Sequence, residues 1–309
     1  MGESILLGDI GGTHSRFALL GDDGRPAEAR AYQNDDVGSL EGAIAQYLEE
    51  TGAQPTQAVL AFATAVLGPE IALTNRNWRF RVAEIEAQFG LARLRAVNDF
   101  EAQAWALPLL GAADLQHIGG PVDMALGPKV VLGPGTGLGL AALIPMDRGW
   151  FAVATEAGHV SFGPTTEDEE DVFARLRQTA ALSAERVLSG PGLQRLHLAL
   201  HPGAPFLAAA AIVAAARSGD VAALATTRLF TRLLGRFAGD MALVFKARGG
   251  VYITGGVGQG LGDHFDVGRF REAFEAHPPY AALLAEIPTN LITRRQPGLL
   301  GCAVLAQQG

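Results

Sequence analysis

Two distant stretches of this chain share one pattern, in which two short apolar runs flank a turn rich in glycine. The first covers residues 5–20 with the turn Gly8-Asp-Ile-Gly-Gly-Thr13, and the second covers residues 129–144 with the turn Gly133-Pro-Gly-Thr-Gly-Leu-Gly139. Apolar runs of strand length around turn residues predict a β-hairpin in each place. The turns begin 125 residues apart, at Gly8 and Gly133, which is a domain-sized interval. The repeat therefore predicts two related domains that each contribute one hairpin to a shared cleft.

The residues of these turns indicate a site for phosphate groups. Glycines expose backbone N–H groups and let a bulky anion approach the chain closely. Asp9 adds a carboxylate to the first turn, which suits a metal ion that accompanies the anion. The alternative is a pair of glycine-rich hairpins that bind no ligand. No Gly-Lys-Ser or Gly-Lys-Thr sequence follows a spaced glycine, so the chain lacks a phosphate loop of the Walker A type.

The composition limits the classes of protein to which the chain can belong. A length of 309 residues, with 49% hydrophobic and 18% charged residues, suits a globular protein of two domains. The net charge is −8 and no block of Lys or Arg occurs, which argues against a nucleic-acid partner. Cys302 is the only cysteine, so neither an internal disulfide nor a cysteine-based metal site can form. Residues 1–4 lack the basic region of a signal peptide, and the apolar segment 206–216 is too short to span a bilayer, so we expect a cytoplasmic protein that contacts no membrane.

The first third of the chain alternates between predicted strands and helices. Beyond the opening hairpin we expect strands at 27–33, 56–63 and 94–98, an irregular β segment at 70–81, and helices at 39–52, 82–89 and 99–107. Ser39 and Gly52 provide the start and stop signals of the first helix. Periodicity is lost between Gly111 and Pro128, where glycine, proline and aspartate are frequent. We therefore expect the chain to cross between domains there.

The second half of the chain is predicted to be richer in helix. We expect strands at 150–155, 250–254 and 286–293, and helices at 167–178, 183–188, 192–200, 206–217, 220–247 and 297–306, with a break at Gly190-Pro-Gly192. The acidic run Glu167-Asp-Glu-Glu-Asp171 is interpreted as the solvated first turn of a helix, with metal binding as the alternative. The third glycine cluster, residues 254–260, lacks the downstream acidic residue of a Rossmann unit. We expect it to be a loop against which an adenine or ribose can lie.

Polar side chains that can do chemistry follow the ends of predicted strands. Asn98 and Asp99 lie where a strand ends and a helix begins, so Asp99 is either a helix cap or a general base at the mouth of a sheet. Glu156 and His159 follow another strand and can converge on one small ligand, unless the loop is ordinary and a backbone carbonyl satisfies His159. Glu185 lies in a short predicted helix, where solvent is the default environment. A polyhydroxylated ligand would use all of these side chains, because carboxylates and amides bond well to pairs of hydroxyls.

Seven motifs that occur in order along the chain resemble those of the bacterial glucokinases of the hexokinase/actin-like superfamily. They are Gly8-Asp-Ile-Gly-Gly-Thr13, Val97-Asn-Asp-Phe100, Leu132-Gly-Pro-Gly-Thr-Gly-Leu-Gly139, Glu156-x-Gly-His-Val160, Ser183-x-Glu-Arg-Val-Leu-Ser-Gly-Pro-Gly-Leu193, Gly255-Gly-Val257 and Gln296-Pro-Gly-Leu-Leu-Gly301. The resemblance implies an α/β fold of two actin-like (ribonuclease H-like) domains, with mixed sheets flanked by helices and a cleft between the domains. It implies a small domain at 1–110, completed by 295–309, and a large domain at 111–294. The implied activity is ATP-dependent phosphorylation of glucose at its 6-hydroxyl.

The resemblance also assigns roles to individual residues. It implies that Asp99 is the catalytic base and that the sugar is bound by Asn98, Asp99, Glu156, His159 and Glu185. The implied contacts to the phosphates of ATP are Gly8, Asp9, Ile10, Gly11, Gly12 and Thr13 in the first turn and Gly133, Gly135, Thr136 and Gly137 in the second. Asp9 would lie near Mg²⁺ and act through water. Gly255 and Gly256 would lie beside the adenosine.

The sequence departs from the family pattern at two places. Ala157 stands where glucokinases usually carry a second glycine, which raises the question of a positive φ at this position. The segment 61–68 lacks the usual Ala-Gly-Pro or Ala-Cys-Pro of the sugar side. A single cysteine excludes the zinc motif of the related repressor/kinase group, and no DNA-reading helix pair precedes Ile5.

Three other functions stay open at this point. The first is a kinase for another hexose, such as mannose or fructose, because the motifs do not fix the configuration of each hydroxyl. The second is a non-catalytic sugar-sensing regulator on the same scaffold. The third is an actin-like assembling ATPase, although such a protein has no evident use for Glu156, His159 and Glu185. The predicted helix at 206–217 could be used for a homodimer or be buried within the second domain.

Overall fold

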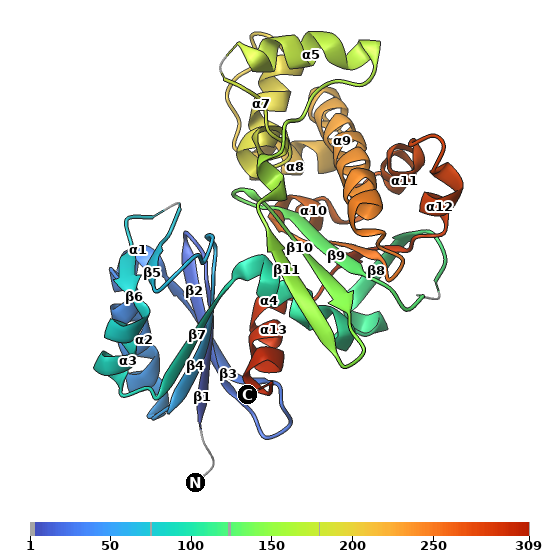
Figure 1. The fold of residues 1–309 in the computed structure, drawn as a ribbon. Coiled ribbons are helices and arrows are strands. Elements are labelled where there is room, and N and C mark those ends of the chain that lie inside the picture. Colours follow the sequence, from blue (N-terminus) through green and yellow to red (C-terminus); the bar gives the residue numbers. More distant parts are fainter. Residues whose placement is uncertain (1–3, 75, 123–124, 179, 309) are drawn as a thin grey trace. The chain divides into compact units, whose positions relative to one another are not determined.

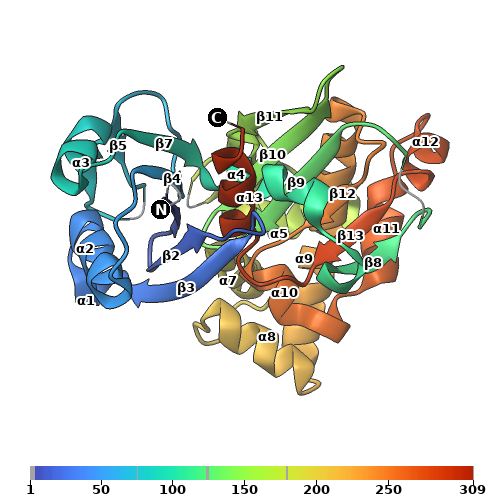
Figure 2. The same cartoon turned by 90° about the horizontal axis from the view of Figure 1, so that it is seen from below.

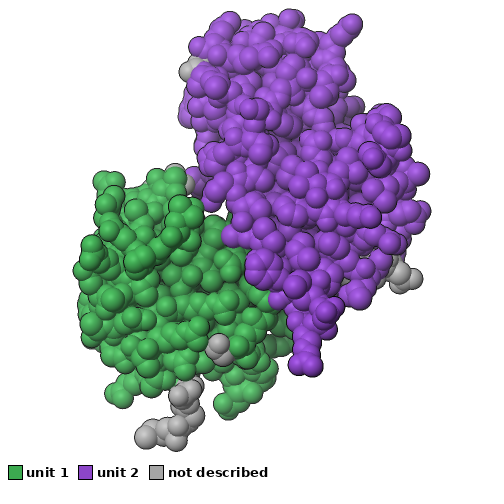
Figure 3. Space-filling model, in the orientation of Figure 1, with its two compact units in different colours: residues 1–110, 294–309 green, residues 111–293 purple. Residues whose placement is uncertain are grey.

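The chain folds into two compact units, which are coloured separately in Figure 3. Unit 1 comprises residues 1–110 and 294–309, and unit 2 comprises residues 111–293. The computed structural model describes residues 4–74, 76–122, 125–178 and 180–308. The chain returns to unit 1 at residue 294, one residue before the expected position.

A five-stranded mixed sheet forms the centre of unit 1 (Figure 1). Its strands follow the order β3-β2-β1-β4-β7, with β1 at Ile5–Ile10, β2 at His14–Leu20, β3 at Pro26–Gln33, β4 at Gln57–Phe62 and β7 at Arg93–Asn98. β1 pairs antiparallel with β2, which confirms the first predicted hairpin, and β1, β4 and β7 are parallel. Ile10, Phe62 and Asn98 are neighbours in register. The carboxyl ends of three strands therefore meet at one edge of the sheet.

Helices cover both faces of this sheet. Figure 1 shows α2 (Leu40–Thr51) and α3 (Val82–Phe89) on one face, and α4 (Asp99–Ala106) and α13 (Pro297–Ala306) on the other. Ser39 caps α2 by accepting a hydrogen bond from Gly42 N at 3.0 Å, and Gly52 ends the helix with a φ of +66°, as its sequence predicts. The core beneath α2 contains Tyr47 and Phe17, both fully buried.

Two short elements complete unit 1. The helix α1 (Asn34–Val37) follows β3 directly and was not expected from the sequence. The predicted irregular β segment is a pair of three-residue strands, β5 (Glu70–Ala72) and β6 (Arg79–Arg81).

The helix α13 has the predicted bounds and crosses α4 closely. Gly301 allows this approach, because any side chain there would collide with the carbonyl of Ala102.

A six-stranded mixed sheet forms the centre of unit 2, and Figure 2 shows its strands in the order β11-β10-β9-β12-β13-β8. The strands are β8 (Leu115–Gly119), β9 (Lys129–Pro134), β10 (Leu138–Pro145), β11 (Trp150–Thr155), β12 (Val251–Ile253) and β13 (Thr289–Ile292). β9 and β10 form the second predicted hairpin, and β12 runs parallel to β9. β8 lies in a segment expected to lack regular structure. It is a short edge strand with two exposed polar residues, Gln116 and His117, so its apolar pattern is weak.

Eight helices are described in unit 2 between Gly111 and Thr293, leaving aside residues 123–124 and 179. They are α5 (Glu167–Arg177), α6 (Ala184–Val187), α7 (Gly190–Leu200), α8 (Ala209–Arg217), α9 (Val221–Phe245), α10 (Gly256–Leu261), α11 (Val267–Glu275) and α12 (Ala281–Ala285). The long helix α9 runs between α8 and α11 (Figure 1). Gly235 lets α11 approach α9, since a side chain there would collide with the carbonyl of Phe270.

Several predictions for unit 2 differ from the structure, and α11 and α12 lie where no helix was expected. Gly256–Leu261 is the helix α10 and not a loop. α7 begins at Gly190, two residues before its predicted start, and the expected break is its first turn. Ser189 caps the helix, and proline suits the first turn of a helix. α8 begins at Ala209, so Phe206 lies outside it and is 70% exposed.

No single helix in the described ranges is both long enough and apolar enough to cross a bilayer. α8 and α9 reach that length and composition only as a pair, which is bent by 111°.

Candidate active site

The turn of the first hairpin lies at the edge of the unit 1 sheet where β1, β4 and β7 end. The carbonyl groups of this turn accept hydrogen bonds from Asn34, the first residue of α1, and from Arg76. Asn34, which is fully buried, donates through Nδ2 to Gly11 O at 2.8 Å and through its backbone N to Thr13 O at 2.9 Å, while Arg76 Nη1 donates to Gly12 O at 3.4 Å. Within the described part of the chain, the N–H groups of Gly12 and Thr13 donate to no other group. A turn with bound carbonyls and available N–H groups is suited to an anion.

Within the predicted phosphate turn, Gly8 and Ile10 are buried residues of β1. The other residues of the turn, Asp9, Gly11, Gly12 and Thr13, are at least partly exposed. A Cβ at Gly8 would lie 2.5 Å from Leu60 Cδ2, so glycine allows the side chains of Leu60, Ile10 and Phe17 to pack closely over β1. The Gly8 carbonyl accepts a hydrogen bond from Cys302 Sγ of α13 at 3.3 Å. The contacts of Gly8 with β4 and α13 therefore hold β1 in place directly before the turn.

Asp9 is half-buried at the end of β1, beside the start of α13. Its Oδ2 lies 3.9 Å from Arg16 Nη1, and a Cβ at Gly298 would lie 3.2 Å from its carboxylate carbon. Burial raises the pKa of Asp9, and the positive charge of Arg16 opposes that shift. The described residues contain no group of three or more His, Cys, Asp or Glu that could bind a metal, so Asp9 does not belong to a cluster of that kind.

Asn98 and Asp99 lie at the same sheet edge, two strands away from Ile10. Strands are spaced about 4.8 Å apart, so this register separates the turn and Asn98 by roughly 10 Å. Asn98 is the cap of α4, since its Oδ1 accepts from Phe100 N at 2.9 Å and from Glu101 N at 3.2 Å. The interpretation of Asp99 as the cap is thus wrong. Asp99 is the first residue of α4, and its Oδ1 accepts from Phe100 N at 3.0 Å.

The turn of the second hairpin is packed among three other segments of unit 2. None of its glycines has a positive φ. A Cβ at Gly133 would lie 2.6 Å from Thr254 Cγ2, so this glycine serves the approach of β12. Gly135 faces open space, and its carbonyl accepts from Gly190 N of α7 at 2.8 Å. Thr136 is exposed. Gly135 and Thr136 therefore form the accessible part of the turn.

Glu185 contacts the second turn directly. Its Oε2 accepts a hydrogen bond from Leu138 N at 2.9 Å, and a side chain at Gly137 would collide with the same oxygen. Glu185 thus has a protein partner, unlike the default expectation of solvent. Its other oxygen, Oε1, makes no hydrogen bond within the described ranges.

Glu156 and His159 are brought to the same place as Glu185. Val160 O accepts from Ala184 N at 3.0 Å, and Ser161 forms a β-bridge with Ser183, so the segment after His159 pairs with the segment before Glu185. His159 Nε2 lies 4.0 Å from Glu156 Oε2, and both side chains are about 60% exposed. The His159 ring therefore lies beside a carboxylate, and no hydrogen bond from it to a backbone carbonyl is found within the described ranges.

The departure at Ala157 is compatible with the loop. Ala157 is the first residue of a 3-10 turn, Ala157–His159, and does not have a positive φ. Gly158 carries the tighter constraint, because a side chain there would collide with the carbonyl of Leu138. Leu138 thus contacts the Glu156–His159 loop through its carbonyl and Glu185 through its N–H.

Gly255 and Gly256 lie beside the second turn. Gly255 has a φ of +92°, and a Cβ there would lie 2.5 Å from Pro134 O. Both features require glycine. Gly256 is exposed and begins α10, so a flat group in this place would meet the first turn of a helix.

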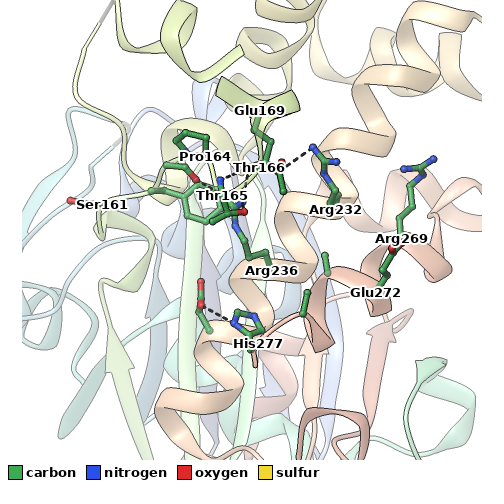
Figure 4. Close-up of a pocket in the computed structure, with 15 residues that line it drawn as sticks. Ser161, Pro164, Thr165, Thr166, Glu169, Arg232, Arg236, Arg269, Glu272 and His277 are labelled. Carbon is green, nitrogen blue, oxygen red and sulfur yellow. Dashed lines mark hydrogen bonds and ion pairs between the residues drawn. The ribbon is translucent and has the colours of Figure 1, made fainter. Parts of the chain in front are cut away.

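A separate cavity of about 610 Å³ lies in unit 2 between the segment 161–166, α9 and α11 (Figure 4). It is lined by none of the predicted site residues. Glu169, at its edge, is 1% exposed and is bound by Arg236 Nη1 at 2.7 Å and Arg232 Nη2 at 3.1 Å. The expectation of a fully solvated acidic run is therefore wrong at Glu169, because α9 supplies two arginines that pair with it.

Several residues around the site were not expected from the sequence. They are Asn34 and Arg76 at the first turn, Thr64, whose carbonyl accepts from Asn98 Nδ2 at 3.1 Å, and Gly298 and Cys302 beneath Asp9. Asn34 directly follows a strand and Asn98 ends one, so the position of Asn34 between a strand and a helix could have indicated it. No sequence pattern around Arg76 indicates that it contacts the first turn.

Comparisons with known proteins identify the family. The family model described as Glucokinase matches residues 6–309. A glucokinase of Chelativorans sp. (strain BNC1) is 42% identical over 311 residues, which cover 98% of this chain and 91% of that relative. The solved structure of a glucokinase from an Antarctic psychrotroph has a TM-score of 0.88 at 31% identity and covers 100% of both chains. A ROK family glucokinase from Streptomyces griseus, solved in complex with glucose and AMPPNP, has a TM-score of 0.66 at 23% identity and covers 99% of this chain and 100% of its own. These likenesses confirm the predicted α/β fold class of actin-like type, and the chain belongs to the glucokinase family of sugar kinases.

Proposed function

We propose that the chain transfers the γ-phosphoryl group of ATP to the 6-hydroxyl of glucose. The observation that carries the proposal is that each unit combines a glycine turn with polar side chains at one sheet edge. In unit 1 the turn ends near Asn98 and Asp99, and in unit 2 the turn is bonded to Glu185. Membership of the glucokinase family and the glucose and AMPPNP bound to the Streptomyces relative support the same reaction.

In this proposal the sugar is bound by Asn98 and Asp99 of unit 1 and by Glu156, His159 and Glu185 of unit 2. Carboxylate and amide groups accept and donate hydrogen bonds, and each bond to a charged group contributes about 1.5–3 kcal/mol. The exposed pair Glu156–His159 and the unbonded oxygen of Glu185 are available to hydroxyl groups.

The phosphates of ATP would contact the N–H groups of Gly12 and Thr13 and the accessible residues Gly135 and Thr136. Gly255 and Gly256 would lie beside the adenosine. A half-buried Asp9 outside any cluster of three metal-binding residues fits Mg²⁺ that is bound mainly by phosphates and water, since Mg²⁺ in phosphoryl-transfer sites takes only one or two carboxylates. Because Arg16 lies 3.9 Å away, Asp9 would act on the ion through water. When bound, Mg²⁺ neutralises charge on the phosphates.

Asp99 is proposed to be the general base. Phosphoryl transfer requires positioning more than covalent chemistry, and the base accepts the proton of the attacking hydroxyl as its oxygen approaches phosphorus in line. The ionised carboxylate of an aspartate is the form that can accept that proton. Its place at the start of α4, next to the cap Asn98, fixes the carboxylate at the sheet edge.

The test is a coupled assay of ADP release with MgATP and a panel of glucose, mannose and fructose. The proposal predicts that glucose gives the highest kcat/KM and that the product is a substrate for glucose-6-phosphate dehydrogenase. A higher kcat/KM with mannose or fructose would replace glucose by another hexose. ADP release no faster than the sugar-free background would favour a non-catalytic sugar-sensing protein.

A further inference from the structure

The hydrogen bond between Glu185 and Leu138 joins two sites that the proposed function treats separately. Glu185 belongs to the proposed sugar site, and Leu138 is the first residue of β10, directly after the second glycine turn. The donor is a backbone N–H, so the carboxylate contacts the main chain of the turn and not a mobile side chain. Any change in the orientation of this carboxylate therefore acts on the turn itself.

The choice of residue at position 137 supports this connection. Gly137 does not have a positive φ, so its backbone conformation is open to other residues. A side chain at position 137 would instead collide with Glu185 Oε2 and displace the carboxylate from its present position. The turn is thus shaped to receive a carboxylate from α6, although the sequence alone suggests that Gly137 serves only a phosphate.

Although the turn as a whole packs against other segments, its central residues 135–137 make few hydrogen bonds. Gly135 N donates to Gly137 O at 2.8 Å and Gly135 O accepts from Gly190 N at 2.8 Å, while Gly135 has open space on its side and Thr136 is exposed. Of the polar side chains within the described ranges, only Glu185 bonds to the backbone of residues 135–138. Its orientation is therefore an important constraint on the part of the turn that faces the phosphates.

We infer that Glu185 is a positioning residue that couples sugar binding to nucleotide binding, an inference that rests on the proposed function. A sugar hydroxyl that donates to Oε1 fixes the carboxylate, and the fixed Oε2 then orders Leu138 and the turn before the nucleotide arrives. The nucleotide no longer has to order the turn, so it binds more tightly. The same hydroxyl disperses the negative charge of the carboxylate, which otherwise opposes phosphates at the neighbouring turn. Both effects have the same sign, and by linkage the nucleotide also tightens sugar binding.

The experiment measures the Kd of a non-hydrolysable ATP analogue with Mg²⁺ by calorimetry, without sugar and at glucose concentrations that saturate each variant. In the wild type we expect glucose to tighten this Kd by about fivefold or more. Glu185→Ala and Gly137→Ala should bring the ratio of the two Kd values to one. Glu185→Gln should keep most of it, because the amide oxygen can accept from Leu138 N while the amide N–H₂ contacts the sugar. Glu167→Ala, which removes an exposed first-turn glutamate of α5, is the matched control and should keep the wild-type ratio.

The outcomes separate this inference from the proposed function. If the wild type neither binds glucose nor releases ADP with it, the proposed function fails. If the wild type phosphorylates glucose but the sugar leaves the Kd of the analogue unchanged, the inference alone is wrong. Gly137→Ala retains the carboxylate for the sugar, so it decides the matter even where Glu185→Ala binds glucose too weakly to saturate. A wild-type ratio in Gly137→Ala would overturn the coupling.

Discussion

Cys302 donates a hydrogen bond through Sγ to the carbonyl of Gly8 at 3.3 Å, and 294 residues of sequence separate the two. The last helix of the chain therefore supports the first strand from below, directly before Asp9. α13 is also the helix whose first turn contains Gly298, next to the Asp9 carboxylate. The C-terminal segment is thus packed directly against the first glycine turn and is not an appendage to the fold.

The burial of Cys302 predicts that its thiol is unreactive in the folded protein. Cys302 is fully buried, and burial, together with the negative charge of Asp9, raises the pKa of its thiol. Since the thiolate is the reactive form, we expect no reaction with Ellman's reagent at pH 8 until the chain is unfolded in guanidinium, when one thiol per chain should react. A stoichiometric reaction of the native protein would show that α13 leaves unit 1 readily.

Gly298→Ala should lower activity without lowering stability. The new Cβ would lie 3.2 Å from the Asp9 carboxylate, so the carboxylate must shift by a few tenths of an ångström. Small misplacements in a site can cost up to about 100-fold in rate, so we expect a clear loss of kcat/KM for MgATP. Alanine is at least as favourable as glycine in a helix, so the Tm should stay or rise. The control is Gly268→Ala, which changes the second residue of α11 as Gly298→Ala changes that of α13, and it should leave kcat/KM unchanged.

Asp99→Asn should abolish most of the turnover and keep the fold. A general base contributes about 10²–10⁴-fold to a rate, and asparagine cannot accept the hydroxyl proton. The cap of α4 is Asn98, so the helix start does not depend on the charge of Asp99. We therefore expect kcat to fall by about 10²–10⁴-fold while the circular dichroism spectrum stays unchanged, and we expect glucose to bind more weakly because one charged hydrogen bond is lost. Glu84→Gln in the first turn of α3 is the control. Near-wild-type kcat in Asp99→Asn would exclude Asp99 as the base.

The sequence predicted those features that depend on neighbours along the chain. The hairpins around Gly8 and Gly133, the helix between Ser39 and Gly52 and the bounds of α13 all follow from local apolar patterns, caps and turn residues. Such signals act between residues that are close in sequence, so they can be recognised without knowing the structure.

Features that depend on distant segments were predicted less well. Gly133 and Gly137 are glycines because Thr254 and Glu185 approach them, and neither contact is visible in a local window. Glu169 was assigned to solvent although Arg232 and Arg236, more than 60 residues later, bury it. β8 was missed because an edge strand with polar residues has little periodicity. Local chemistry and the resemblance to the family predicted the site residues, and long-range packing explains the surroundings of several of them.

Glu169→Ala should destabilise unit 2 strongly. The Glu169 side chain is 2% exposed and pairs with Arg236, whose side chain is 12% exposed and also donates to Gly163 O at 2.6 Å. Removing one partner of a buried ion pair leaves an uncompensated charge and costs about 3–5 kcal/mol. Glu170→Ala next to it, where an exposed glutamate lies 3.5 Å from Arg177, should cost at most about 1 kcal/mol. Urea unfolding of both variants gives the comparison, and equal losses would contradict the role of the Arg232–Glu169–Arg236 cluster.

Stability should fall in alkaline solution partly through Tyr47. Burial raises the pKa of Tyr47 from 10.0 to about 12. Below pH 10 the phenol is neutral in both the folded and the unfolded chain, so its contribution is complete. Between pH 10 and about 12 the unfolded chain loses the proton and the folded chain keeps it, so the free energy of unfolding falls by about 1.4 kcal/mol per pH unit from this group. Tyr47→Phe removes this dependence, and it also loses the hydrogen bond to Glu28 O at 3.2 Å. Urea unfolding at a series of pH values should therefore show a smaller alkaline slope in Tyr47→Phe, and an unchanged slope would show that the Tyr47 phenol ionises as readily in the folded chain as in the unfolded one.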